Sequence, residues 1–533
     1  MTKSYHIFYF PFIVKTEGEI RFSDLVNLSR MGADNEWKRV LQTEESENYD
    51  EKMYYHHFVH NAMYDNGGVF EKGIQTKDKG RHKDLDTSTK KNLIYQYEAN
   101  LKEGLEFRIR KEKKEGDEYK FVFEYSLKID RITLDYYFTE VGILSLYISN
   151  DQYTSPQDIL NINYYGRRLY KTYQNDSEKI TLSLLGQSDD LMNVQTPYSL
   201  SGHVKGLLDN FFEVDKRNLK PKYLPIFDNR MYVSCCLVDN ELSNKLRFCS
   251  LSRLSNDIFW QNFVEVDCDD SFGCQNESMR MRQTQRNSYL RWQNFGTLYG
   301  ITDRSFVCLI SESEFAETTV THMRTIYSQM VKLVLVQRAS LLKFSDDINS
   351  VDIEKNTFRA ADHISRIYRD YIVYMKQLYF REVTSQIQGV ELYNMFQSVF
   401  DIKERIESCN EELNKMHTYL STLKDVDKKD EQNKIFNIWA GACLPITLIT
   451  GVLGMNKVFN LDTLDFDRLK FDVDFIVNLC VVFLFTFIVW ILLYKNNAIT
   501  KSLVKESKKI KGGLLVLFIV FLALVLILYT NLV

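Results

Sequence analysis

Small and polar side chains recur at helical spacing inside the apolar segment that ends at Asn456. Steps of three and four residues select one stripe: Asn433, Phe436 (or its neighbour Asn437), Ala440, Leu444, Thr447 and Gly451. Pro445 has no N–H, so the carbonyl of Gly441 one turn earlier is left for another partner. Small and polar residues avoid lipid and face other helices or water. On a self-associating helix, this stripe predicts a pore at the axis of a homo-oligomer.

A second group of chemistry-bearing residues lies in "NYYGRRLY". Arg167 and Arg168 follow a glycine and are flanked by Tyr164, Tyr165 and Tyr170. Arginine beside aromatic rings can hold a phosphate and stack on a base. The motif therefore predicts a nucleotide site, and the alternative is a solvated turn beside a strand.

Other ligand patterns are weaker. His56 and His60 have the i,i+4 spacing of a metal pair, without an evident third ligand. Asp267, Asp269 and Asp270 do not form a calcium loop, because the glycine comes one place late and Ser278 stands at the twelfth position. The nine cysteines form no CxxC pair, which argues against zinc, redox use and a disulfide framework. We find no nucleotide-binding glycine loop, HExxH or GxSxG and predict no enzyme, and the net charge of −4 argues against direct nucleic-acid binding.

Three apolar segments at the C-terminus set the frame for the stripe: 435–453, 475–494 and 514–533. Each is close to the roughly 20 residues that a helix needs to cross a bilayer. The connector after the second segment carries six lysines, whereas the connector after the first carries five aspartates. The positive-inside rule then predicts a multi-pass protein of the bacterial inner membrane, in contact with the lipid bilayer, with its N-terminus in the cytoplasm and its C-terminus outside.

The helix that leads into the first segment has an apolar seam whose spacing alternates between three and four residues. The seam comprises Val399, Ile402, Ile406, Cys409, Leu413, Met416, Leu420 and Leu423. Such spacing is typical of a coiled-coil stalk. The alternative is an ordinary long helix packed in a bundle.

The stretch "PITLITGVLGMN" resembles the signature of the CorA family of divalent-cation channels. The order of parts is also similar: a large cytoplasmic domain, a long stalk helix, the signature, an acidic outer loop, a second span and a basic tail. Leu453 stands where the family usually has tyrosine, and Lys457 directly follows the signature. These departures, like the extra third span, bear on magnesium selectivity.

The resemblance implies a homopentamer whose first span lines a pore. Asn456 would ring the mouth and hold a hydrated cation such as Mg²⁺ through its amide oxygen, with Gly454 permitting the turn and Met455 packing behind it. Thr447 and Gly451 would offer oxygens deeper in the pore, and Leu444 and Phe436 would be apolar constrictions. The acidic outer loop would contribute Asp462, Asp465 and Asp467.

We expect three domains: an α/β domain over 1–312, a helical bundle and stalk over 313–434, and a transmembrane domain over 435–533. Strand-like runs such as "YHIFYFPFIV", "VGILSLYI" and "SFVCLIS" support the first, while the charged stretch 44–92 is interpreted as surface loops. The helical pattern begins at Glu314 and includes "MRTIYSQMVKLVLVQRASLLKF".

A looser resemblance links "HIFYFPF", "ILNINYYGRRLY" and "VQRASLLKFSDDI" to a CorA-like branch associated with type III CRISPR systems. It implies an antiviral effector channel controlled by an adenine-nucleotide second messenger, for example an AMP conjugate of S-adenosylmethionine, bound by the cytoplasmic domain. The alternative function is a housekeeping magnesium transporter regulated by intracellular magnesium.

Overall fold

The computed structural model describes residues 3–15, 37–40, 51–65, 93–101, 104–169, 178–185, 200–212, 222–269, 273–351 and 357–453. The chain divides into two compact units. The first comprises 1–353 and 362–417, and the second comprises 354–361 and 418–533. The candidate site lies in the first unit.

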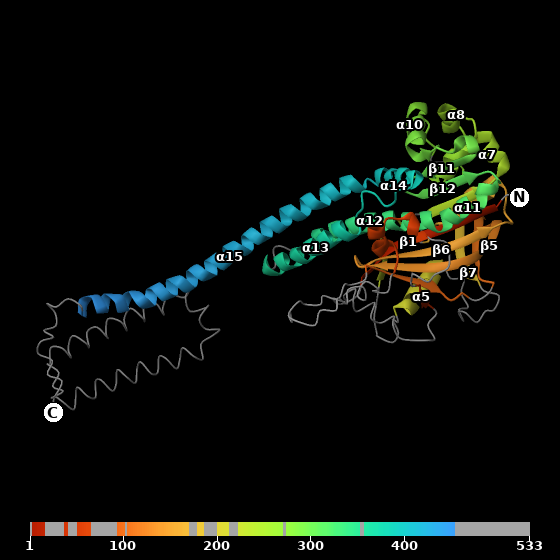
Figure 1. Ribbon diagram of the computed structural model, residues 1–533. Coiled ribbons are helices and arrows are strands. Elements are labelled where there is room, and N and C mark those ends of the chain that lie inside the picture. Colours follow the sequence, from red (N-terminus) through yellow and green to blue (C-terminus); the bar gives the residue numbers. More distant parts are fainter. Residues whose placement is uncertain are drawn as a thin grey trace, which may run out of the picture. The chain divides into compact units, whose positions relative to one another are not determined.

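A 12-stranded mixed sheet forms the body of the first unit (Figure 1). Its strands are β1 (Lys3–Lys15), β2 (Trp37–Arg39), β3 (Ile94–Ala99), β4 (Glu106–Glu115), β5 (Glu118–Tyr137), β6 (Val141–Asn150), β7 (Glu178–Leu185), β8 (Lys222–Pro225), β9 (Tyr232–Val238), β10 (Ser288–Tyr289), β11 (Thr297–Ile301) and β12 (Ser305–Ile310). The main path runs β10-β11-β12-β9-β1-β6-β5-β3-β2, while β4 joins β5 to β7 and β8 pairs with β1. Only β9 and β12 pair in parallel along this path, so both of these strands begin at the same end of the sheet.

The described helices fall between and after the strands. They are α2 (Glu51–Tyr54), α3 (His57–Met63), α4 (Pro156–Gly166), α5 (Leu200–Phe211), α7 (Asn240–Leu246), α8 (Leu251–Ser255), α9 (Ile258–Glu265), α10 (Glu277–Asn287), η4 (Gln293–Phe295), α11 (Glu314–Arg324), α12 (Ile326–Asn349), α13 (Thr357–Gln377), α14 (Ile387–Val399) and α15 (Ile402–Leu453). The helices α2 and α3 fall within the stretch 44–92 that we interpreted as loops, and Val59, Ala62 and Met63 of α3 are buried.

The central strand β1 contains a proline, which cannot donate to a sheet ladder. Pro11 is tolerated because, on one side of β1, it lies between the residues that pair with β9 and the residues that pair with β8. Up to Tyr9 the strand pairs with β9, and from Phe12 it pairs with β8. The missing N–H therefore falls where the neighbouring strand changes.

Both faces of the sheet centre are buried. Alternate residues of a strand point to opposite faces, so neighbouring residues of β1 pack on different sides. Phe8, Phe10 and Phe12 of β1 belong to the apolar core that also includes residues of α4, α5 and α9. Tyr9 points the other way, and its hydroxyl donates to Ser328 Oγ of α12 at 3.0 Å. This second face is partly polar.

A buried ion pair joins α12 to the second face. Lys332 Nζ lies 2.5 Å from Asp135 Oδ2, and both side chains are almost fully buried. Gln96 Nε2 donates to the other Asp135 oxygen at 2.7 Å. The pair ties α12 to β5 in one register.

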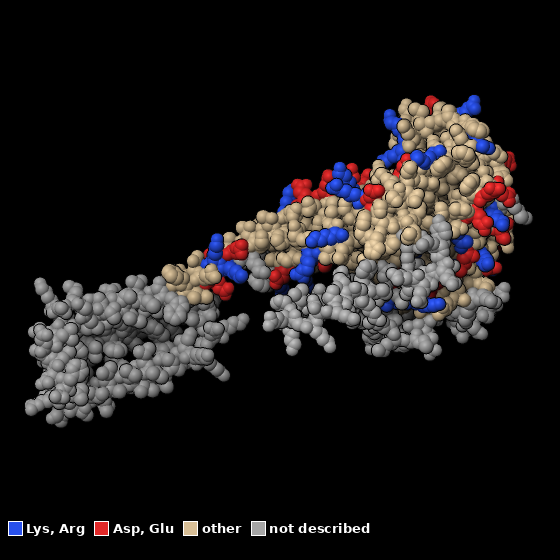
Figure 2. All heavy atoms as spheres, in the orientation of Figure 1, with Lys and Arg blue, Asp and Glu red and all other residues tan. Residues whose placement is uncertain are grey.

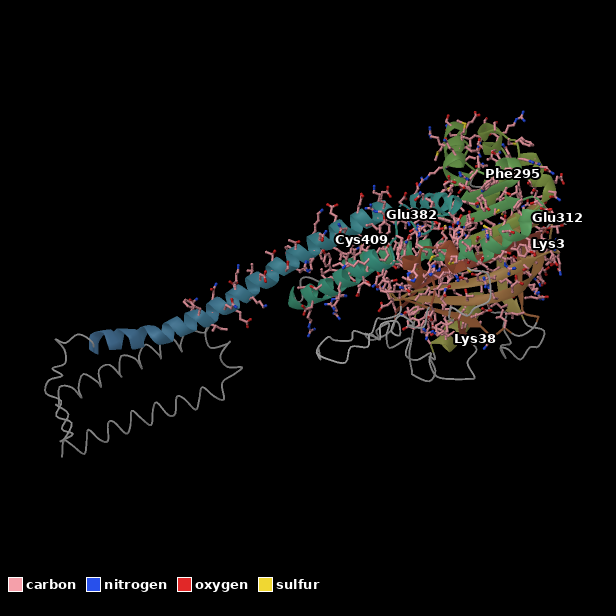
Figure 3. The ribbon with its side chains drawn as sticks, in the orientation of Figure 1. Lys3, Lys38, Phe295, Glu312, Glu382 and Cys409 are labelled. Atoms are coloured by element: carbon pink, nitrogen blue, oxygen red, sulfur yellow. The ribbon has the colours of Figure 1, made fainter. Side chains whose placement is uncertain are left out.

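The apolar seam of α15 is buried within the same chain over its first turns. Ile406, Cys409 and Leu413 are buried, and Cys409 is labelled on α15 in Figure 3. Tyr371 of α13 donates from its hydroxyl to the Ile406 carbonyl at 3.2 Å. The packing here is that of the helical bundle that we gave as the alternative to a coiled-coil stalk.

The prediction of a transmembrane domain is corrected by the structure. In the part of the chain that is described, none of the helices has a stretch long and apolar enough to cross a membrane. This finding contradicts the predicted three-span transmembrane domain, the class of membrane channel and the multi-pass inner-membrane location. The described side chains of α15, which end at Asn437, are mostly charged or polar and exposed. Figure 2 shows blue and red side chains interspersed along this helix.

Several predictions fall outside the described residues. They concern the segments 475–494 and 514–533, the mouth residues Gly454, Met455 and Asn456, and the loop carboxylates Asp462, Asp465 and Asp467. The α/β part of the predicted fold agrees with the mixed sheet.

Candidate functional site

The helix α4 ends just before Arg167, which lies at the end of the sheet where β9 begins. Ser155 caps the helix by accepting the N–H of Asp158 at 3.1 Å, and Pro156 occupies its first turn. At the other end, a Cβ on Gly166 would stand 2.8 Å from Phe8 Cζ, so glycine lets the helix close down on β1. Arg167 follows at once as the C-cap residue.

Two hydrogen bonds clamp Arg167 to Met231, the residue before β9. Its carbonyl accepts the Met231 N–H at 2.7 Å, and its Nε donates to the Met231 carbonyl at 2.9 Å. These bonds use the backbone oxygen and one guanidinium nitrogen. The two terminal nitrogens of Arg167 make no hydrogen bond or ion pair with any residue that the structure describes.

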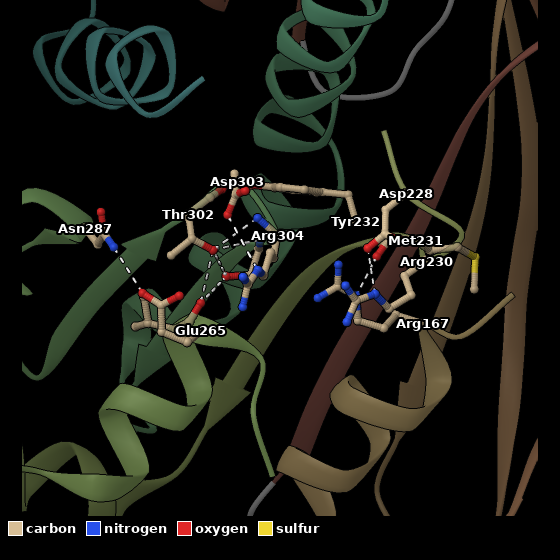
Figure 4. A network of polar contacts seen from close by, with 12 residues as sticks. Arg167, Asp228, Arg230, Met231, Tyr232, Glu265, Asn287, Thr302, Asp303 and Arg304 are labelled. Carbon is tan, nitrogen blue, oxygen red and sulfur yellow. Dashed lines mark hydrogen bonds and ion pairs between the residues drawn. The ribbon is translucent and has the colours of Figure 1, made fainter. Parts of the chain in front are cut away.

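Two more arginines stand at the starts of the parallel strands, beside Arg167 (Figure 4). Arg230 precedes β9, and its Nε lies 2.6 Å from Asp228 Oδ2. Arg304 precedes β12, in a turn where Thr302 Oγ1 accepts the N–H groups of Arg304 and Ser305 at 3.2 and 3.1 Å. Because neighbouring parallel strands start at the same end of the sheet, the residues that precede them lie close together.

The helices contribute the last two arginines. Arg338 of α12 lies between two aromatic rings, 4.6 Å from the ring centre of Phe227 and 5.2 Å from that of Phe400. Its Nε is buried without a hydrogen-bond partner. Arg405 of α15 donates from Nε to the Phe400 carbonyl at 3.1 Å. We call Arg167, Arg230, Arg304, Arg338 and Arg405 the arginine cluster.

The electrostatics of the arginine cluster favour a bound anion. Burial, followed by the charges of Arg230 and Arg304, lowers the pKa of Arg167 to about 9. Burial, followed by the charge of Arg405, also lowers the pKa of Arg338. Four carboxylates lie nearby: Asp228, Asp303, Asp401 and Glu265. None is within ion-pair distance of Arg167 or Arg338 among the described residues, so the two guanidiniums lack counter-charges at close range.

The two adjacent arginines predicted to act together point to different places. Arg168 does not join the arginine cluster, because its guanidinium lies over the rings of Tyr164 and Tyr165, 4.4 and 5.0 Å from their centres. The hydroxyl of Tyr165 accepts from Lys111 Nζ at 2.6 Å. The aromatic neighbours in the motif therefore serve Arg168, while Arg167 alone enters the site. Tyr170 lies outside the described residues.

Metal-ligating side chains gather near Tyr165. One ligand atom each from Asp267, Cys268 and Asp269 lies within 4.8 Å of the others. Burial raises the pKa of the Cys268 thiol to about 11, so the thiolate that metals prefer is disfavoured. His56 instead begins α3, with Nε2 3.7 Å from a Glu382 oxygen. A role for Mg²⁺ stays a prediction.

A buried cysteine, histidine and asparagine also meet in the sheet, without the properties of a catalytic set. His6 Nδ1 lies 2.8 Å from Asn163 Oδ1, and Cys235 is the register partner of His6 on β9. Burial lowers the pKa of His6 to about 4 and raises that of Cys235 far above its usual range. Both groups are neutral and inaccessible at pH 7.

The predicted pore stripe lies on α15, as far as it is described. The side chains of Asn433 and Phe436 are exposed, with 70% of Phe436 accessible. Ala440, Leu444, Thr447 and Gly451 belong to the same helix by their backbone, and their side chains lie outside the description.

Sequence reasoning found Arg167 but missed the other four members of the cluster. A signal was present for two of them, because "DNRMYV" and "DRSFVCL" both place Asp and Arg directly before a buried apolar strand. Arg338 also had a signal, since it interrupts the apolar run "LVLVQRASLL". Arg405 stands in the charged run "IKERIE" and has none.

Comparison of the chain with family models, with curated proteins and with solved structures finds no match. The predicted kinship to the CorA family and to its CRISPR-associated branch rests on the sequence motifs alone.

Proposed function

We propose that the α/β unit is a sensor that binds the phosphate groups of an adenine nucleotide at the arginine cluster. The observation that carries this proposal is Arg167: 5% of the residue is accessible, and its guanidinium has no carboxylate within ion-pair distance and no hydrogen bond from its two terminal nitrogens among the described residues. A buried charge without a partner is costly, and native proteins keep one mainly where function needs it.

Phosphate fits the cluster better than a metal ion does. Guanidinium groups bind phosphate oxygens in a bidentate manner, and several converge here from different elements. A cation would meet like charge at every arginine. The adenine part of the proposal comes from the resemblance to the type III CRISPR-associated branch, in which a messenger adenylate is the expected ligand.

The proposal is tested by calorimetric titration of the full chain. The panel contains AMP, ATP, a cyclic oligoadenylate, an AMP conjugate of S-adenosylmethionine, and inorganic pyrophosphate as the minimal anion. We expect binding by at least one adenylate, with pyrophosphate as a weaker competitor.

Two single substitutions at neighbouring positions give a matched pair. Arg167→Met should weaken binding by roughly 10- to 150-fold, because a charge-assisted hydrogen bond contributes about 1.5–3 kcal/mol. Arg168→Met removes the same charge one residue away and should change the affinity less than about threefold, since its guanidinium lies over the rings of Tyr164 and Tyr165 and not in the arginine cluster. Equal losses from both variants, or no binding by any panel member, would overturn the proposal.

A further inference from the structure

The corner between α14 and α15 is built around the arginine cluster. Phe400 is almost fully buried at this corner, and its ring contacts that of Tyr232 at 5.8 Å between centres as well as Arg338. Asp401, which follows, has a φ of 50°, a left-handed conformation that residues other than glycine rarely adopt. The side chains around the corner must therefore hold Asp401 in this backbone conformation.

Arginine side chains provide that support. Arg286 of α10 donates from Nη2 to the Ser398 carbonyl at 3.0 Å and lies 3.5 Å from Asp401 Oδ1. Arg405 donates to the Phe400 carbonyl, as described above, and Arg338 covers the Phe400 ring. Two of these three arginines also belong to the arginine cluster.

We infer that Arg338 is both a phosphate contact and the residue that couples the arginine cluster to the α14–α15 corner. The inference rests on the proposed function. Arg338 and Arg405 repel each other, and neither has a carboxylate within ion-pair distance among the described residues. An anion between them would remove the repulsion and hold both side chains still. Because one of them covers the Phe400 ring and the other caps the Phe400 carbonyl, an occupied cluster stabilises the corner and the first turns of α15.

The geometry also indicates why Arg338, and not lysine, stands here. Its guanidinium carbon lies over the rings of both Phe227 and Phe400. An ammonium has no plane to stack and no fork of donors. Ring stacking and phosphate binding can therefore occur together only with arginine.

The experiment is hydrogen exchange of the full chain, read by mass spectrometry on peptides covering 396–410, with and without pyrophosphate. The adenylate that binds in calorimetry is used in parallel. We expect the ligand to slow exchange of these amides by about tenfold in the unaltered protein, in the range of ordinary allosteric coupling. Calorimetry on the same samples establishes occupancy.

Three variants separate the roles. Arg338→Met should keep measurable binding through Arg167 but lose the slowed exchange. Arg338→Lys should keep the affinity within about threefold but lose most of the slowed exchange. Lys343→Met, on the same helix but paired with Glu140 and Asp347, should retain both binding and slowed exchange. Thermal unfolding establishes that each variant is folded.

The outcomes distinguish the two proposals. Binding without slowed exchange at 396–410, or slowed exchange that survives both Arg338 substitutions, would overturn the coupling role and leave the proposed function standing. Failure of every panel member to bind would overturn both. Loss of slowed exchange in Lys343→Met as well would assign the effect to α12 in general and refute a specific role for Arg338.

Discussion

Replacing Arg167 by methionine should stabilise the ligand-free protein, although it removes a hydrogen bond. The charge of Arg167 is disfavoured by burial, and the fall of its pKa from the ordinary arginine value to about 9 corresponds to roughly 5 kcal/mol. Against this stands the Met231 carbonyl, which loses the Nε–H of Arg167 at a cost of about 1–3 kcal/mol. The difference predicts a gain of roughly 2–4 kcal/mol in the free energy of unfolding.

Urea unfolding of the full chain measures this gain. The fluorescence of Trp260 is a suitable signal, because this side chain is fully buried in the same unit and donates from Nε1 to Ser288 Oγ at 3.0 Å. Arg168→Met is the control and should have the opposite sign, since it only loses contacts with two tyrosine rings that contribute about 0.5–1 kcal/mol each.

One result would refute the reasoning. If Arg167→Met lowers the free energy of unfolding by more than about 1 kcal/mol, the guanidinium is a structural brace for Met231, and its hydrogen bond outweighs the cost of its charge. A variant that is more stable and no longer binds a phosphate ligand would show the trade between stability and function that is common at binding sites.

Three further predictions concern the rest of the first unit. Lys332→Met should cost about 3–5 kcal/mol in urea unfolding because it strands the buried Asp135 carboxylate, whereas the double variant with Asp135→Leu should recover most of that cost; a loss below 1 kcal/mol would contradict this account. His6 has a pKa of about 4 when folded and 6.5 when unfolded, so the unfolded chain takes up the proton first and the free energy of unfolding should fall by about 3 kcal/mol as the pH drops from 6.5 to 4; if His6→Gln shows the same pH dependence, His6 is not its source. Glu140 has a φ of 64°, so Glu140→Gly should raise the melting temperature by relieving about 1 kcal/mol, while Glu140→Gln, which keeps the strain, should not; equal behaviour of the two variants would argue against strain.

Local patterns predicted the central strands well. The runs "YHIFYFPFIV", "VGILSLYI" and "SFVCLIS" coincide with β1, β6 and β12, because β-branched and aromatic residues in short apolar runs favour strands. The run around Lys332 and Arg338 coincides with α12. The prediction of membrane spans at 435–453, 475–494 and 514–533 was wrong, because no helix in the described part of the chain is long and apolar enough to cross a membrane.

The site was less predictable because its members are far apart in the chain. The two hydrogen bonds between Arg167 and Met231 bring Arg167 next to Arg230, and Arg304 joins them because β12 runs parallel to β9. Such a pairing depends on sheet order, which a single sequence does not specify. The local motif was also misleading, since the tyrosines beside Arg167 stack on Arg168.

The position of β1 has a consequence for how the protein is made. This strand is synthesised well before its partners β6 and β9, which begin only at Val141 and Tyr232. At roughly 5–20 residues per second, β9 follows β1 by about 10 to 45 s. During that time the segment "HIFYFPF" has no native partner on one side, and such an apolar strand pairs readily with other chains. Protection of this strand by a chaperone during synthesis is therefore expected to raise the yield of folded protein.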